Sequence, residues 1–123
     1  MTLFDSSNAI YLQVADLMFE RILTNEWMEK ERIPSIREVA TMVQVNPNTV
    51  ARSFTFLQEN AVIFNKRGVG YFVSDDGKAQ VTKIKKTEFI HTKLPKIFHD
   101  ASLLDVSPEE FSALYSQFLE AKS

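Results

Sequence analysis

The sequence predicts a mainly α-helical protein with one small β-hairpin, and three observations support this fold class. Hydrophobic residues make up 45% of the 123 residues and charged residues 24%, while glycine and proline together contribute only 7. This composition is typical of a folded chain rather than a disordered one. Apolar residues recur at helical steps of three and four near both ends of the chain, and two short β-prone runs flank a glycine-containing loop at residues 65–70. The length favours one domain, or one small domain with an appendage.

Several classes of site are excluded by composition. The chain contains no cysteine, so disulfides, thiolate metal sites and cysteine nucleophiles are absent, which fits a reducing compartment. No apolar run approaches the length of about 18 residues that marks a membrane-spanning helix. His91 and His99 have no partner at ligand spacing. We therefore expect a cytoplasmic location, no membrane partner, no metal and no other cofactor.

The first helix is expected over residues 9–24. Its apolar stripe consists of Ile10, Val14, Leu17, Met18 and Ile22. Ser6, Ser7 and Asn8 are candidate N-caps for this helix. A connector or short strand over residues 27–32 follows it.

A capping box at Ser35–Glu38 predicts a second, short helix. In this motif the serine side chain accepts from a backbone N–H three residues on, and the glutamate reaches back to the serine N–H. The helix is expected to end near Val43. Its inward positions are Ile36, Val39, Ala40 and Val43.

Asn46 and Pro47 predict the start of a third helix. The residue before proline avoids the α region, whereas proline itself suits the first helical position behind an asparagine cap. The start of this helix is expected to offer free backbone N–H groups to a phosphate. The helix extends to about residue 59, with Asn60 as a left-handed C-cap. Its inward positions are Val50, Phe54 and Leu57.

The second half of the chain begins with the hairpin. Residues 62–64 and 71–73 are the expected strands. Residues 78–104 read as a long, imperfect helix that Pro95 should kink or split at about residue 94. A second capping box at residues 107–110 opens the last helix, whose stripe is Phe111, Leu114, Tyr115, Phe118 and Leu119.

This order of elements is typical of a winged helix-turn-helix. The tight turn before Pro47 lets the third helix lie in a DNA major groove while the second crosses the backbone. Residues 30–73 hold six basic and three acidic residues, a net charge of +3, in a chain whose total is −2. A local basic face is what phosphate contact requires, although ordinary scatter of surface charge is the other explanation.

Three segments resemble the GntR family of bacterial transcription regulators. They are Ile33-Pro34-Ser35-Ile36-Arg37-Glu38-Val39-Ala40, Val45-Asn46-Pro47-Asn48-Thr49-Val50-Ala51-Arg52 and Lys66-Arg67-Gly68-Val69-Gly70-Tyr71-Phe72-Val73. The second segment is similar to the form found in the YtrA-like subfamily, whose members have only a short helical tail. Where the wider family has arginine this chain has Pro47, so the operator sequence cannot be borrowed from that family.

The resemblance implies a DNA-binding regulator, with residues 1–76 as the winged helix-turn-helix domain. The implied partner is a double-stranded DNA operator. The residues expected at the DNA are Ser35, Arg37, Asn46, Asn48, Thr49, Arg52, Lys66, Arg67, Gly68 and Gly70. In the major groove asparagine suits adenine, arginine suits guanine or phosphate, and threonine can touch a thymine methyl.

Other interpretations of these residues stay open. Ser35 can serve mainly as a cap, Arg37 can be a solvated arginine, and Arg52 can pair with Glu59 or Glu38. Asn48 and Thr49 suit any helix start, and the two glycines suit any tight turn. A winged-helix module for protein interaction without DNA binding is the alternative function. A hydrolase is excluded because the chain has no nucleophile constellation and no phosphate-binding loop.

Residues 77–123 are expected to form a short two-helix dimerisation tail. They display more apolar side chains than two helices can cover, and an exposed patch of that size usually marks an interface. We therefore expect a homodimer, and no large effector pocket within one subunit; whether an effector exists is not indicated. The expected interface residues are Ile90, Leu94, Ile97, Phe98, Leu104, Phe111, Leu114, Tyr115 and Phe118.

Overall fold

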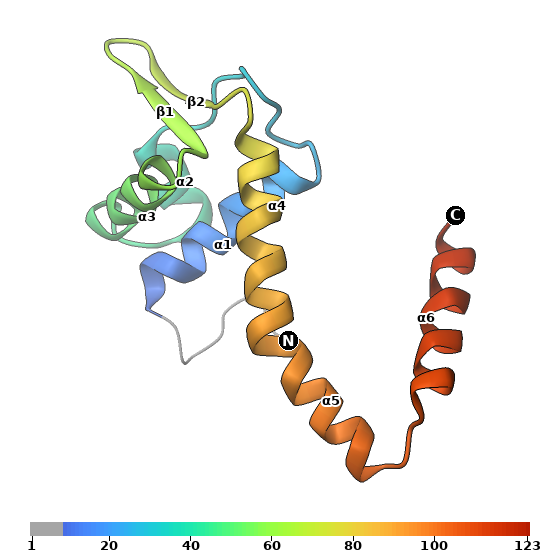
Figure 1. Ribbon diagram of the computed structural model, residues 1–123. Helices are drawn as coiled ribbons and strands as arrows, with labels where there is room; N and C mark the ends of the chain where they lie inside the picture. The colour runs from blue at the N-terminus through green and yellow to red at the C-terminus, as the bar shows by residue number, and fades with distance from the viewer. Residues whose placement is uncertain (1–8) are drawn as a thin grey trace. The chain divides into compact units, whose positions relative to one another are not determined.

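The computed structural model describes residues 9–123 and confirms a mainly helical chain with one antiparallel hairpin (Figure 1). The candidate caps Ser6, Ser7 and Asn8 lie outside the described residues. In chain order the elements are α1 (Ile10–Leu23), α2 (Ile36–Val43), α3 (Pro47–Glu59), β1 (Ile63–Lys66), β2 (Gly70–Val73), α4 (Gly77–Glu88), a π-helix η1 (Phe89–Lys93), α5 (Leu94–Leu103) and α6 (Pro108–Lys122).

The chain divides into two compact units between Ile84 and Lys85. We call residues 9–84 the winged-helix unit and residues 85–123 the C-terminal unit. The sequence-based boundary lay earlier, between residues 76 and 77. The difference arises because α4 begins inside the first unit: Val81 is fully buried in its core, and Ile84 packs against that core.

The core of the winged-helix unit lies where α1, α2, the hairpin and the start of α4 meet α3. Its most completely buried hydrophobic side chains are Val14, Val50, Phe54, Leu57, Val62, Val73 and Val81. Ser53 of α3 is also fully buried, and its hydroxyl donates to the backbone oxygen of Tyr11 at 2.6 Å. Each inward position predicted for α3 is therefore confirmed.

The start of α1 differs from the expectation. Ala9 occupies the N-cap position and makes no side-chain capping hydrogen bond. Ile10, which was expected in the stripe, is 50% exposed. Phe19 instead is buried, because the helix is covered on a wider face than the sequence stripe indicated.

The two helices of the helix-turn-helix begin as the sequence predicts. Ser35 Oγ accepts from the Glu38 N–H at 3.1 Å, and the Ser35 N–H donates to Glu38 Oε1 at 3.0 Å, so the capping box is complete. Asn46 caps α3 and Pro47 is its first residue. The predicted left-handed cap at Asn60 is wrong: Asn60 has a φ of −95°, and the next residue, Ala61, has the positive φ of 59°.

The hairpin pairs Ile63 with Val73 and Lys66 with Gly70 at its two ends. The connector before α2 adds bridges to β2, with Glu29 opposite Val73 and Arg32 opposite Phe72. One face of the hairpin is held to the core by Tyr71, whose ring meets the Phe54 ring edge-on at 4.8 Å. The other face carries the stacked rings of Phe64 and Phe72, 5.7 Å apart.

The C-terminal unit contains the end of α4, η1, α5 and α6. The long helix is split near residue 94 as expected: the π-helix over Phe89–Lys93 separates α4 from α5, whose second residue is Pro95. Proline cannot donate the backbone hydrogen bond that a continuous α-helix needs at that place. Ser107 caps α6 by accepting from the Glu110 N–H. Among the described residues, no helix has the length and apolar character needed to cross a bilayer.

Candidate nucleic-acid interface

Helix α3 separates a buried face from a polar, exposed one. Its inward side chains, including Val50, Phe54 and Leu57, have no exposed area. Because successive residues turn by about 100°, most of the residues between them lie on other faces of the helix, although Ser53 is also buried. Asn48, Arg52 and Thr55 are exposed and Thr49 is partly buried, so α3 presents hydrogen-bonding side chains to solvent.

The start of α3 is already hydrogen-bonded within the chain. Asn46 Oδ1 accepts from the Asn48 N–H at 2.7 Å, and the Thr49 N–H donates to the Asn46 backbone oxygen at 3.0 Å. Pro47 has no N–H to offer. The expectation of free backbone donors for a phosphate is therefore wrong at these positions, and contacts from this end of α3 have to come from side chains.

The start of α2 holds a charged cap. The pKa of Glu38 is lowered, chiefly because its carboxylate accepts the Ser35 backbone N–H, then through the Ser35 side chain, with a smaller contribution from the charge of Arg32. Capping is thus confirmed for Ser35. Its oxygen accepts the Glu38 N–H and the hydroxyl group stabilises the Glu38 carboxylate, so the Ser35 hydroxyl is engaged in the cap.

Arg37 is exposed at the outer surface of α2. Its side chain borders a shallow hollow at the turn between α2 and α3. The hollow is lined by Arg37, Ala40, Thr41, Val45 and Pro47. The Arg37 side chain is therefore open to solvent.

The wing is the turn between β1 and β2. Lys66, Arg67 and Gly68 are exposed there, and Gly68 has a φ of 80°. Gly70 has a φ of 140°, and Arg32 Nε lies 2.7 Å from the place where a Cβ on Gly70 would stand. The backbone conformation at this position favours glycine, and the Arg32 side chain packs over it.

Arg32 is a basic residue that sequence reasoning did not single out. It is one of the six basic residues in the segment 30–73, but no neighbouring residue in the sequence indicates a contact with the wing. The contact depends on the bridge between Arg32 and Phe72, which joins residues far apart in sequence. Arg32 adds a positive charge at the base of the wing.

Arg52 does not form either of the expected ion pairs. Neither Glu59 nor Glu38 lies within ion-pair distance of it in the described part of the chain. Its guanidinium carbon instead lies 4.1 Å from the centre of the Tyr11 ring, in α1. Sequence reasoning missed Tyr11 because it falls outside the stripe of α1, and only the packing of α1 on α3 brings it to Arg52.

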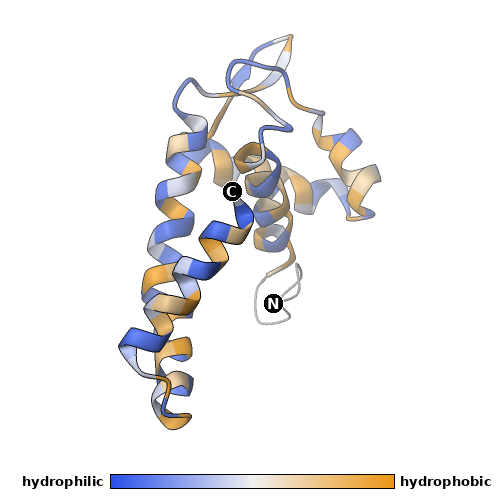
Figure 2. Ribbon diagram, turned by 90° about the vertical axis from the view of Figure 1, so that its right-hand side faces the viewer, coloured by the Kyte–Doolittle hydropathy of each residue, from blue (hydrophilic) through white to orange (hydrophobic). Residues whose placement is uncertain are grey.

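The expected dimer residues are mostly exposed in the C-terminal unit, and Figure 2 shows hydrophobic stretches along its helices. Leu104, Phe118 and Tyr115 are 75%, 63% and 60% exposed, while Leu94 and Phe111 are partly buried. The other exposed members of the predicted set are Ile90, Ile97, Phe98 and Leu114. Leu103, at 67%, belongs to the same surface and was not predicted.

Two open grooves lie between α5 and α6. One, of about 570 Å³, is lined by residues that include Phe98, Pro108 and Phe111. The other, of about 470 Å³, includes Ile97, Leu114 and Phe118. These volumes fall within the range of ligand pockets, but both grooves are open apolar surface rather than an enclosed cavity. The expected absence of an enclosed effector pocket stays a prediction.

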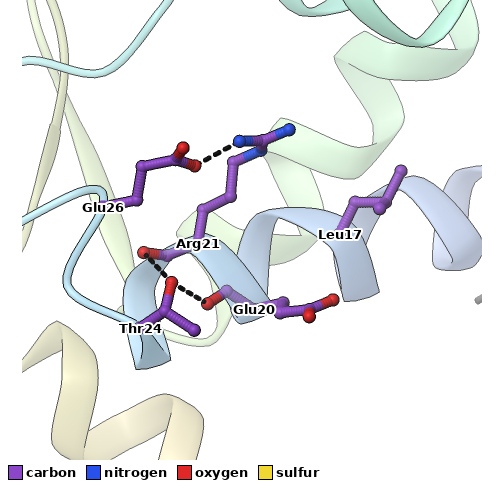
Figure 3. Close-up of a pocket in the computed structure, with 5 residues that line it drawn as sticks. All are labelled: Leu17, Glu20, Arg21, Thr24 and Glu26. Atoms are coloured by element: carbon purple, nitrogen blue, oxygen red, sulfur yellow. Dashed lines mark hydrogen bonds and ion pairs between the residues drawn. The ribbon is translucent and has the colours of Figure 1, made fainter.

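A further hollow lies at the end of α1 (Figure 3). It is lined by Leu17, Glu20, Arg21, Thr24 and Glu26. Arg21 and Glu26 form an ion pair across it, and the Thr24 hydroxyl donates to the Glu20 backbone oxygen at 3.0 Å. The Thr24 contact closes the last turn of α1.

Comparison with known proteins gives a consistent result. Residues 10–73 match the family model described as bacterial regulatory proteins, gntR family. The chain is 31% identical to the helix-turn-helix-type transcriptional regulator YhcF of Bacillus subtilis over 95% of both chains. It is 32% identical to the transcriptional repressor YtrA of the same organism, over 85% of this chain and 80% of that one.

A solved structure extends the similarity to the whole chain. A GntR-family transcriptional regulator from Bacteroides thetaiotaomicron is 37% identical, with a TM-score of 0.77. The match covers 94% of this chain and all of that one. The winged helix-turn-helix and the helices that follow it are therefore found together in a relative of the same size.

Proposed function

The chain belongs to the GntR family of bacterial transcriptional regulators, which are not enzymes, and from this premise we propose that it is a cytoplasmic repressor that binds an inverted-repeat operator as a homodimer. The assignment of repression follows the YtrA relative, which is a transcriptional repressor. The operator and the dimer are argued from this chain's own surfaces.

The observation that carries the proposal is the two-sided character of α3. Its apolar side is fully buried, and the opposite side exposes Asn48, Arg52 and Thr55. A protein-interaction surface would be expected to present apolar or aromatic anchors at this place. Polar side chains with bidentate hydrogen-bonding capacity suit base edges in the major groove instead.

The remaining predicted residues suit contacts with the DNA backbone. Lys66 and Arg67 are exposed at the wing, with Arg32 at its base, and Arg37 is exposed on α2. Phosphate contacts position a protein on the duplex, while base contacts specify the sequence. We assign the wing and α2 to positioning, and the outer face of α3 to sequence recognition.

The homodimer follows from the apolar surface of the C-terminal unit. A single recognition helix reads only a few base pairs, and specificity in a genome requires more. A second copy can cover the exposed leucines and aromatics of α5 and α6 while bringing a second α3 to the DNA. With two-fold symmetry the half-sites would be about 34–36 Å apart or somewhat closer.

The test is a gel-shift titration of the promoter upstream of the chain's own gene, followed by footprinting. We expect two protected half-sites in an inverted repeat. Lys66→Ala and Arg67→Ala should each lower the salt dependence of binding by about one unit of slope, if each contacts one phosphate. Lys83→Ala, which lies outside the wing, serves as the matched control. Indifference to every DNA fragment would favour the winged-helix protein-interaction module instead.

A further inference from the structure

Tyr11 fastens the first turn of α1 to α3 through three contacts. The buried Ser53 hydroxyl donates to its backbone oxygen. Its ring meets the Phe56 ring edge-on, with centroids 6.4 Å apart. The guanidinium carbon of Arg52 then lies 4.1 Å from the ring centre, at the surface. The first two contacts hold Tyr11 against α3, and in the third contact the Tyr11 ring supports the Arg52 guanidinium.

Stacking on a ring engages the face of a guanidinium but leaves its edges free. The five N–H donors of arginine point outward in the plane of the group. The guanidinium carbon of Arg52 lies over the Tyr11 ring at 4.1 Å from its centre, a separation that suits stacking through the face. Arg52 is exposed, so these in-plane donors remain accessible to an acceptor outside the protein. Holding the side chain on the ring also reduces the rotamer freedom that Arg52 would lose on binding.

We infer that Tyr11 is a positioning residue for DNA recognition, which holds Arg52 at the edge of α3 nearest α1 with its donors turned to the DNA. This inference rests on the proposed function. It adds a residue of α1 to a recognition surface that otherwise consists of α2, α3 and the wing. The alternative is that Tyr11 only packs α1 against α3, in which case Arg52 would act independently of it.

A double-mutant cycle separates these two roles. The probe is a duplex selected by the wild-type protein from random double-stranded DNA, and its dissociation constant is measured for the wild type, Tyr11→Leu, Arg52→Ala and the double variant. We expect Tyr11→Leu to weaken binding about two- to fivefold, the equivalent of one surface cation–π contact. In the Arg52→Ala background the same change should have no further effect. Tyr11→Phe keeps the ring and should bind nearly as the wild type does.

Ile22→Val is the matched control, because it loosens the buried face of α1 about three helical turns from Tyr11 and leaves the ring contacts of Tyr11 in place. It should lower the melting temperature while leaving base preference and salt slope unchanged. Arg52→Ala is expected to change base preference or salt slope. Tyr11→Leu should change the same property in the same direction, by a smaller amount.

Four outcomes would be decisive against the inference. They are equal effects of Tyr11→Leu with and without Arg52, equal effects of Tyr11→Leu and Tyr11→Phe, no effect of Arg52→Ala on DNA binding, and a change of base preference by Ile22→Val. If the wild-type protein selects no duplex at all, the proposed function itself fails. That result differs from all four.

Discussion

The winged-helix unit and the C-terminal unit both contain many apolar residues, but they place them differently. In the first, Phe54, Leu57 and Val81 have no exposed area. In the second, no residue from Lys85 to Ser123 is fully buried, and Leu103 and Leu104 are 67% and 75% exposed. One unit can hold its fold through its own core, whereas the other presents apolar surface that needs a cover. Four changes test whether the two units differ in this way.

Removal of the C-terminal unit should have the largest effect. A chain shortened to end at Ile84 keeps the whole core, so we expect it to stay folded, become monomeric and lose operator affinity by orders of magnitude. Light scattering, thermal unfolding and gel shift measure the three properties. A chain that ends at Asp76 is the comparison: it lacks Val81, so it should unfold at a lower temperature. An equally tight operator complex of the chain ending at Ile84 would contradict the role of α5 and α6.

Truncation of one large side chain in each unit should affect different properties, the stability in one case and the self-association in the other. Phe54→Ala should lower the free energy of unfolding by about 3–5 kcal/mol, because it leaves a cavity in a close-packed core. Leu104→Ala, at a largely exposed position, should hardly change the stability of the monomer but should weaken self-association. Denaturant titration at two protein concentrations measures both effects. A loss for Leu104→Ala that is as large as that for Phe54→Ala, at all concentrations, would mean that the two units do not differ in this way.

Gly77→Ala tests the junction of the hairpin with α4. A Cβ at this position would stand 2.7 Å from the Val62 backbone oxygen and 2.7 Å from Val73 Cγ1. Overpacking of this kind costs about 1–3 kcal/mol, so the winged-helix unit should melt earlier. Ala79→Ser is the control, because Ala79 lies two residues further along α4 and is exposed. An unchanged melting temperature for Gly77→Ala would show that the backbone there yields easily.

Acid should have the smallest effect, confined to the start of α2. The folded-state pKa of Glu38 lies below the ordinary value of about 4.5. The ionised carboxylate therefore stabilises the folded state above the pKa of the unfolded chain, and this contribution is lost as the pH falls through the lower folded-state pKa. Glu38→Gln should flatten the pH dependence of the melting temperature below about pH 5. Identical pH profiles for the two proteins would remove Glu38 from this role.

Local sequence signals predicted the elements whose chemistry is itself local. The capping box at Ser35 and the helix start at Asn46-Pro47 each depend on residues within one turn of each other. All the residues that form them are therefore close together in the sequence, and the motifs can be recognised there. The shift of the left-handed residue from Asn60 to Ala61 shows the limit. Asparagine tolerates a positive φ better than alanine does, but the Val62 N–H bonds to the Leu57 backbone oxygen and sets where the chain turns.

Contacts between distant segments could not be read from the sequence. Arg52 stacks on Tyr11, and Arg32 covers Gly70, only because α1 packs on α3 and the connector bridges β2. The domain boundary moved for the same reason, since Val81 completes a core assembled by earlier elements. The π-helix was signalled only by its neighbour Pro95, which marks an interruption without specifying its geometry.

Gly77 has a mechanical consequence for the wing. At this point the backbone of α4 touches the hairpin through Val62 and Val73 with no side chain of its own between them. Side chains yield by changing rotamer, whereas close-packed backbone transmits displacement with little loss. The Gly77 N–H also donates to the Ser74 backbone oxygen at 2.8 Å, and the Ser74 N–H to that of Val62 at 3.0 Å. The hairpin and the first turn of α4 are thus joined directly, which restricts movement of the hairpin relative to this turn.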